Sequence, residues 1–143
     1  MGVRIITDSA SDFEAAVAKR RKIDIVPMTI QFGSAAFLAG KTLSNDVFYQ
    51  LLQEGRENPS TSQPAPAAFL QLFEEARRDG DQVVVILLSG VLSGTMQSAM
   101  IAKGMCGYEP IYIIDSLTVS AGIQILVNYA CKLRDSGLPA AGI

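Results

Sequence analysis

The hydrophobic positions of this chain fall into two kinds of run, one typical of buried strands and one typical of amphipathic helices. Apolar runs rich in β-branched residues occur at 3–6, 23–32, 83–88 and 111–114. A run without polar alternation, clearest at 83–88, suits a strand buried on both faces of a parallel sheet. Helical spacing predicts helices over 11–21, 46–54, 66–79, 94–103 and 118–134. Strands that alternate with such helices predict an α/β fold with three α/β/α layers and a mainly parallel sheet.

Local signals set the expected ends of several elements. Ser11 followed by Glu14 predicts a capping box for the first helix, and Ser44 is expected to cap the second. Pro27 predicts an edge position or a bulge in the second strand region. Residues outside these patterns, at 33–42 and 55–66, are expected to form loops. The second loop contains three prolines and is either functional or a plain connector.

The segment 83–99 is the candidate binding site. A buried strand is followed here by hydroxyl and glycine residues, and then by a helix. Ligands of open α/β sheets bind just past the carboxyl ends of the strands, so Ser89, Ser93 and Thr95 are expected at that mouth. The free N–H groups of the helix start favour an anion. A plain capping role for Ser93 is an equally good interpretation of this spacing.

Polar residues also follow the first and last predicted strands, as Asp8-Ser9 and Asp115-Ser116. Because parallel strands end at one edge of a sheet, both pairs should converge on the 89–95 segment. Thr61 and Ser62 reach the same edge if their loop folds over it. This set of hydroxyl and amide donors suits a carboxylate or a phosphate. An aspartate in the position of Asp8 more often caps a turn than binds a ligand.

The composition disfavours several classes of function. The 143 residues are 49% hydrophobic with a formal net charge of −2, which predicts one domain with a substantial core and argues against nucleic-acid binding. No Ser-His-Asp triad can form because the chain has no histidine, and its scattered aspartates suggest no metal site. Neither phosphate-binding glycine motif is present. An enzyme acting on small anions or phosphates is therefore the weaker alternative.

The sequence also gives expectations about location. No apolar run reaches the roughly 18 residues needed to span a bilayer, and the N-terminal residues lack the layout of a signal peptide. Cys106 and Cys131 are isolated from each other and from any metal-ligand spacing, which is typical of reduced thiols. We expect a cytoplasmic protein without a transmembrane segment.

Several short motifs follow one another along the chain. They are Thr7-Asp8-Ser9-Ala10-Ser11-Asp12, Val26-Pro27, Phe48-Tyr49, Pro59-Ser60-Thr61-Ser62-Gln63-Pro64, Leu92-Ser93-Gly94-Thr95 with Gln97-Ser98-Ala99, and Ile114-Asp115-Ser116. This series resembles the amino-terminal domain of the DegV family of bacterial fatty-acid-binding proteins. The T-S-Q-P and L-S-G-T-x-Q-S-A motifs are specific in combination. The resemblance covers essentially the whole chain, which we therefore treat as one domain over 1–143.

The resemblance implies a lipid carrier that is not an enzyme and needs no cofactor or metal. Family members enclose one long-chain fatty acid and present its carboxylate to a separate fatty acid kinase. Carried over by motif, Thr61 and Ser93 would bind the carboxyl group, with Ser62 and Gly94 flanking them and Thr95 close by. Supporting roles are expected for the strand-end residues Asp8, Ser9, Ser89, Asp115 and Ser116.

The chain also departs from the family pattern. Gly90 follows Ser89 where two serines are usual, Met96 stands where tyrosine is common, and Ala39-Gly40-Lys41 replaces an aspartate-glycine loop. The family is roughly twice as long, and we expect its second, lipid-enclosing domain to be absent here. An acyl chain contributes about 0.8 kcal/mol per methylene only where it is buried, so we expect impaired lipid binding. The alternative is a remnant that binds no lipid and forms a homo-oligomer through the face left open.

Overall fold

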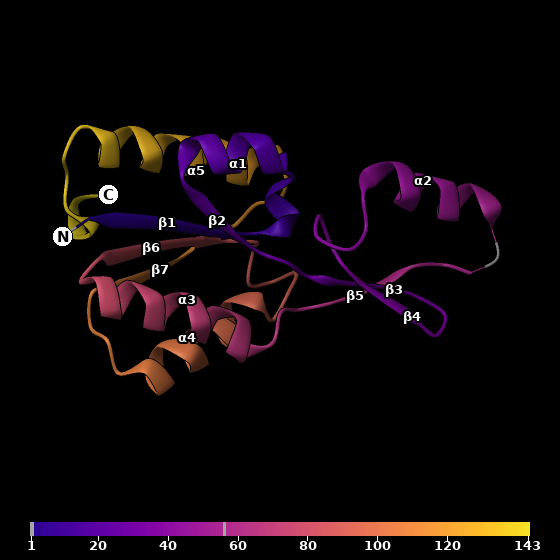
Figure 1. Cartoon of the computed structure of the whole chain (residues 1–143), viewed down its shortest axis with the longest axis horizontal. Helices are drawn as coiled ribbons and strands as arrows, with labels where there is room; N and C mark the ends of the chain where they lie inside the picture. The colour runs from indigo at the N-terminus through magenta and orange to yellow at the C-terminus, as the bar shows by residue number, and fades with distance from the viewer. Residues whose placement is uncertain (1, 56) are drawn as a thin grey trace.

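The chain folds into a three-layer α/β/α body with a small lobe at one end, as Figure 1 shows. The computed structural model describes residues 2–55 and 57–143. The sheet of the body has the strand order β2-β1-β6-β7, and every pairing in it is parallel. Its strands are β1 (Val3–Asp8), β2 (Ile23–Val26), β6 (Gln82–Leu87) and β7 (Ile111–Asp115). This arrangement confirms the predicted α/β fold and its parallel sheet.

Helices cover both faces of this sheet. One face carries α1 (Ala15–Arg21) and α5 (Ala121–Asp135), and the other carries α3 (Pro66–Asp79) and α4 (Thr95–Cys106) (Figure 1). Short 3₁₀ turns follow β1 (η1, Ser9–Ser11) and α5 (η2, Ala140–Gly142). Among the residues that the structure describes, no helix is long and apolar enough to cross a membrane.

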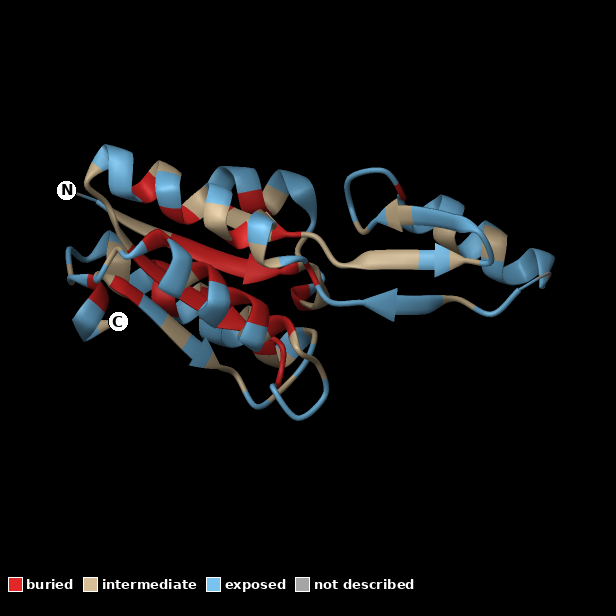
Figure 2. Cartoon of the chain, turned by 90° about the horizontal axis from the view of Figure 1, so that it is seen from below, coloured by how far each residue is buried: buried red, intermediate tan, exposed pale blue. Residues whose placement is uncertain are grey.

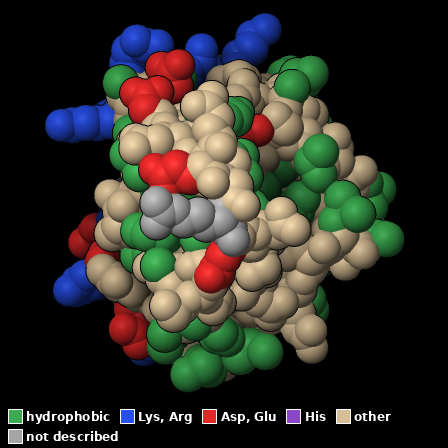
Figure 3. Space-filling model, turned by 90° about the vertical axis from the view of Figure 1, so that its right-hand side faces the viewer, with side chains coloured by type: hydrophobic (Ala, Val, Ile, Leu, Met, Phe, Trp, Pro, Cys, Tyr) green, Lys and Arg blue, Asp and Glu red, His purple; other side chains and the backbone are tan. Residues whose placement is uncertain are grey.

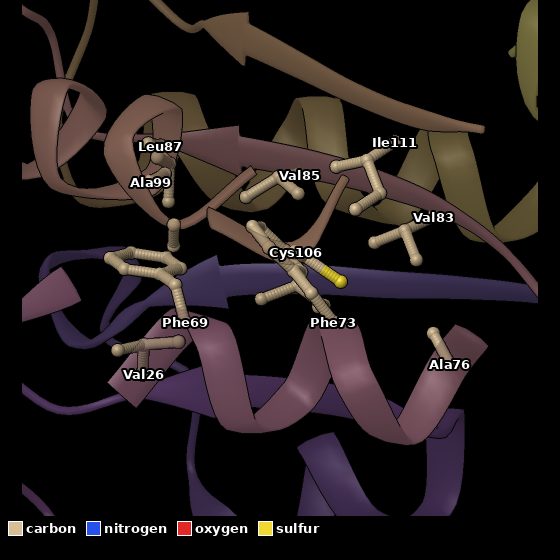
Figure 4. Close-up of a cluster of buried hydrophobic side chains, with 12 residues drawn as sticks. Val26, Phe69, Phe73, Ala76, Val83, Val85, Leu87, Ala99, Cys106 and Ile111 are labelled. Carbon is tan, nitrogen blue, oxygen red and sulfur yellow. The ribbon is translucent and has the colours of Figure 1, made fainter. Parts of the chain in front are cut away.

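The core consists of two clusters, one on each face of the sheet. Adjacent residues of β1 contribute to different clusters, because successive side chains of a strand point to opposite faces. Ile6 packs with Phe69 and Phe73 of α3, whose rings project toward the sheet in Figure 4. Ile5 packs with Ile123 and other apolar residues of α5. Figure 2 shows that burial is concentrated in this body and is sparse in the lobe.

The lobe contains a second, antiparallel sheet with the strand order β4-β3-β5. Its elements are β3 (Thr29–Phe32), β4 (Ala35–Leu38), β5 (Ser60–Ser62) and helix α2 (Asn45–Glu54). The rings of Phe32 and Phe48 pack edge to face with their centroids 5.8 Å apart, and this contact holds α2 against one face of the sheet. The prediction of loops at 33–42 and 55–66 is therefore wrong where it covers β4 and β5.

The second strand region behaves as Pro27 predicts, but with a larger consequence. The region 23–32 divides at Pro27-Met28 into β2, an edge strand of the body, and β3, the centre of the lobe. Proline lacks the N–H that a ladder requires, so the chain leaves the first sheet at this point and begins the second.

The two predicted helix caps have different outcomes. Ser44 caps α2 as predicted, since its Oγ accepts a hydrogen bond from the Val47 N–H at 3.4 Å. The Ser11–Glu14 capping box is wrong. Ser11 is buried and its Oγ donates to the Asp8 carbonyl at 2.7 Å, while α1 begins only at Ala15 and Glu14 makes no side-chain cap. The hydroxyl of Ser11 is thus engaged within the turn that follows β1 and does not cap α1.

Candidate functional site

The hydroxyl of Ser93 lies at the start of α4, just beyond the carboxyl end of β6. Its Oγ accepts a hydrogen bond from the Thr95 N–H at 3.2 Å and lies 2.8 Å from the Thr95 Oγ1. Gly94 is the N-cap residue of α4, so Ser93 precedes the cap position that the capping interpretation assigns to it, and its bond reaches only the N–H of the first helical residue. A serine hydroxyl has one donor and two acceptor positions, so these two contacts leave it capacity for one further partner. The bond to Thr95 and ligand binding are therefore compatible at Ser93.

Thr61 and Ser62 lie on β5 and are both exposed. Thr61 is paired with Ile30 and Ser62 with Thr29 of β3. Because neighbouring side chains of a strand project to opposite faces, the two hydroxyls point to different sides of the lobe sheet. Thr61 shares its face with Ile30, and therefore with Phe32 and α2. The structure thus separates two residues that the sequence pattern places side by side.

The Thr61 strand and the Ser93 turn meet through Gln63. Its Nε2 donates a hydrogen bond to the Ser98 Oγ of α4 at 3.1 Å. Its amide also lies directly over Gly94, where an added Cβ would come within 1.9 Å of the Gln63 Oε1. The two motifs, which are far apart in the sequence, are therefore in contact in the fold. Sequence reasoning quoted Gln63 as part of a motif and assigned it no role.

Asp8 is fully buried at the end of β1, and backbone donors engage its carboxylate. Its Oδ1 accepts from the Ala10 N–H at 2.9 Å and its Oδ2 from the Leu88 N–H at 2.7 Å. Burial raises the pKa of Asp8 above its ordinary value, and the hydrogen bonds from Leu88 and Ala10 oppose that rise. Ser9 accepts from the Met28 N–H at 3.0 Å. These contacts hold neighbouring loops together, and they favour the turn-cap interpretation of Asp8.

The other strand-end residues shape the loops around α4 in the same way. Asp115 accepts from the Gly90 N–H at 3.1 and 3.2 Å and from the Leu117 N–H at 2.9 Å. An added Cβ on Gly90 would meet the Asp115 Oδ2 at 2.9 Å, so glycine permits this close approach. Ser89 is buried, and Ser116 bonds both backbone groups of Thr118. Asp8 and Asp115 thus tie the ends of β1 and β7, the two strands beside β6, to the segment 88–90.

A cavity of about 760 Å³ that sequence reasoning missed lies between the body and the lobe. Apolar side chains from both parts line it, and they include Phe13, Ile25, Ile30, Leu43 and Phe48. Charged residues of both signs also line it, namely Lys19, Lys41, Asp12, Glu14 and Asp24. Since Ile30 is the strand partner of Thr61, the cavity adjoins the face of the lobe sheet on which Thr61 lies. The residues that the structure describes contain no cluster of three His, Cys, Asp or Glu suited to a metal ion.

Comparison with known proteins gives a consistent result. The sequence model described as "Uncharacterised protein, DegV family" matches residues 2–143. A DegV domain-containing protein of Caldanaerobacter subterraneus subsp. tengcongensis is 36% identical over 135 residues, covering 94% of this chain and 48% of the relative. The chain therefore spans about half the length of the curated relatives it matches.

Two solved structures share the fold at a comparable level. One is a DegV family protein from Thermus thermophilus, described by its fatty acid binding, with 30% identity and a TM-score of 0.87 over 96% of this chain and 49% of that one. The other is the fatty acid kinase B3 protein of Streptococcus pneumoniae loaded with linoleic acid. It is 26% identical with a TM-score of 0.84, and the match covers 99% of this chain and 51% of that one. From the family match along its whole described length, this chain belongs to the DegV family.

Proposed function

We propose that this chain is the head-group half of a fatty acid carrier and that it is not itself an enzyme. In this proposal Thr61 and Ser93 bind the carboxylate of a long-chain fatty acid. Ser62 and Gly94 are their neighbours in the sequence, and Thr95 lies close to Ser93. One observation carries the proposal: the strand that bears Thr61 packs through Gln63 onto the helix turn that bears Ser93. The fatty acids named for the solved relatives support the choice of ligand.

The chemistry of the site fits a carboxylate. The first N–H groups of α4 have no acceptor within the helix, and the helix dipole favours a negative charge there. A hydroxyl that donates to a charged group contributes about 1.5–3 kcal/mol, and the dipole about 0.3–1 kcal/mol. The acyl chain contributes about 0.8 kcal/mol for each buried methylene, so it dominates affinity when it is enclosed. We therefore expect this chain alone to bind weakly compared with its full-length relatives.

The partner in this proposal is a fatty acid kinase, which would receive the exposed carboxylate. The similarity to the fatty acid kinase B3 protein of Streptococcus pneumoniae supports this choice. The ligand is the fatty acid, and the proposed role requires no cofactor. The formal net charge of −2 gives no support to nucleic-acid binding. The cytoplasmic location stays a prediction.

The binding test uses delipidated protein and a matched set of hydroxyl variants. A calorimetric titration with oleate should detect binding. Thr61→Ala and Ser93→Ala should each raise the dissociation constant about tenfold, which is about 1.4 kcal/mol of binding free energy. Ser60→Ala is the control, because that hydroxyl belongs to the same exposed strand and is the immediate neighbour of Thr61. Submicromolar binding that survives both site variants would overturn the site. Absence of binding at millimolar oleate would overturn the carrier role of this chain.

Self-association is the second candidate, and a specific surface favours it. Edge strand β7 exposes Tyr112 and Ile114, and α5, the helix that follows it in the chain, exposes Ile125, Leu126 and Tyr129. The lobe also carries exposed apolar side chains, which Figure 3 shows at that end of the molecule. Exposed apolar patches commonly mark interfaces. Sedimentation at increasing concentration should reveal a homo-oligomer that Ile125→Glu weakens, and a monomer at every concentration would exclude this candidate.

A further inference from the structure

The side chain of Gln63 bridges two segments of the proposed head-group site that are separated by 35 positions in the sequence. Its Nε2 donates to the Ser98 Oγ at 3.1 Å, and Ser98 is only 1% exposed. A partner this deeply buried holds its position through the packing of α4. The amide of Gln63 is therefore anchored to a rigid element of the body, although Gln63 itself belongs to the exposed segment after β5.

The glycine at position 94 has a structural explanation in this contact. Its backbone angles, φ −77° and ψ 9°, do not require a glycine. An added Cβ, however, would lie 1.9 Å from the Oε1 and 2.7 Å from the Cδ of Gln63. Glycine at this position thus permits the close approach of the Gln63 amide, which a side chain here would displace. The amide of Gln63 fills the space that a larger residue at position 94 would occupy.

The bridge fixes the strand on which Thr61 lies. On one side, β5 is held by its ladder with β3, in which Thr61 is paired with Ile30. On the other side, Gln63 is held on α4 and is followed by the buried Pro64, whose ring restricts φ. Thr61 is two residues from this anchor. The backbone at Thr61 therefore lies between its ladder with β3 and the contact of Gln63 with α4.

We propose that Gln63 is the positioning residue of the head-group site. Its amide holds Thr61 at the first turn of α4 and leaves ligand contact to the hydroxyls. This inference rests on the proposed function, since it concerns the same site. It adds a feature that the hydroxyl motifs alone do not contain: two side-chain ligands on separate segments bind one carboxylate more tightly when the distance between them is already fixed.

The first experiment tests the bridge in ligand-free protein. Backbone ¹⁵N relaxation should give order parameters near 0.85 at positions 61 and 62 in the wild type and below about 0.6 in Gln63→Ala. Gly94→Ala should have the same effect, because it displaces the amide. The double variant Gln63→Ala/Gly94→Ala should be no more mobile than either single variant. Additive effects, or no change in mobility, would overturn the bridge.

The second experiment tests the consequence for binding. Gln63→Ala should weaken oleate binding about tenfold in calorimetry, while the midpoint of thermal unfolding stays within two degrees or so of the wild type, as expected for a surface change. Gln63→Glu keeps the length of the side chain and an acceptor for the Ser98 hydroxyl, so it should restore the rigidity of 61–62. Gln71→Ala is the control, because Gln71 is an exposed glutamine whose side-chain amide bonds Glu75 within its own helix.

The outcomes separate this inference from the function on which it rests. Loss of rigidity at 61–62 with unchanged oleate affinity would overturn the positioning role and leave the carrier role intact. Absence of oleate binding in the wild type would overturn the proposed function, while the relaxation experiment would still decide whether Gln63 holds β5 on α4.

Discussion

The Oδ2 of Asp8 accepts a hydrogen bond from the backbone N–H of Leu88 at 2.7 Å, across a sequence separation of 80 residues. The bond joins the carboxyl ends of β1 and β6, two adjacent strands of the sheet. The other oxygen of the same carboxylate bonds the Ala10 N–H at 2.9 Å. One buried side chain therefore fixes both the turn after β1 and the start of the segment that leads to Ser93.

Replacing Asp8 should destabilise the whole fold. Asp8→Ala leaves the buried N–H of Leu88 without its acceptor and also removes the cap at Ala10, so the free energy of unfolding should fall by about 1–3 kcal/mol. Urea unfolding followed by circular dichroism measures this change. Glu14→Ala is the control, because that exposed carboxylate makes no cap bond. Its removal should change the free energy of unfolding by no more than about 0.5 kcal/mol. Equal losses in the two variants would contradict the role of Asp8.

Asp8 should also titrate above the ordinary aspartate pKa of 3.8, chiefly because burial disfavours its charged form. The folded state then binds the Asp8 proton more tightly than the unfolded state does. The contribution of Asp8 to the free energy of unfolding should therefore fall as pH rises from 3.8 through the folded pKa, and stay constant above it. A carbon-detected NMR titration of the Asp8 carboxyl measures the midpoint. A midpoint at or below 3.8 would show that the two N–H donors outweigh burial.

Two glycines near the end of α4 should respond oppositely to alanine. Gly104 lies within the helix, and an added Cβ there meets nothing within 4 Å, so Gly104→Ala should stabilise the fold by roughly 0.5–1 kcal/mol. Gly107 has φ +60° at the C-terminal cap, where a side chain is strained, so Gly107→Ala should destabilise it by about 1 kcal/mol. Thermal unfolding of both variants compares the two effects. A shift of the same sign in both would contradict this assignment.

The core beneath α3 should depend strongly on Phe73, which is fully buried and packs against Phe69 and the sheet (Figure 4). Phe73→Ala should lower the free energy of unfolding by about 3–5 kcal/mol, through lost burial and the cavity left behind. Phe73→Leu should cost less. Met105→Ala on the exposed side of α4 is the control for loss of a large apolar side chain. Calorimetric or urea unfolding gives the three values, and a loss in Met105→Ala as large as that in Phe73→Ala would contradict the assignment of the core.

Local sequence patterns predicted those elements that are stabilised within their own segment or by burial of an unbroken apolar run. The run at 83–88 predicts β6, Ser44 predicts the start of α2, and Pro66 is the first residue of α3 as the pattern indicates. The pattern failed at β4 and β5, which are three or four residues long and mostly exposed. Their hydrogen bonds go to β3, and no local apolar alternation reveals a distant partner.

The same local patterns predicted only some of the candidate site residues. The motifs selected the Thr61 and Ser93 segments, and the strand-end rule indicated that Asp8 and Asp115 lie at one edge of the sheet. The rule did not show that both carboxylates are occupied by backbone N–H groups, at Leu88 and Gly90. It also gave no role to Gln63, because a lone glutamine in a proline-rich segment has no periodic or spacing signal.

The sequence by itself determined the layered α/β architecture, the family and the two segments that carry the hydroxyls. It did so because apolar periodicity and short motifs are properties of consecutive residues. Only the tertiary structure decided that Thr61 and Ser62 face opposite sides of β5, and that Gln63 sits on Gly94 and Ser98. Strand register and side-chain contact between distant segments depend on where the whole chain packs, and no single stretch of sequence contains that information.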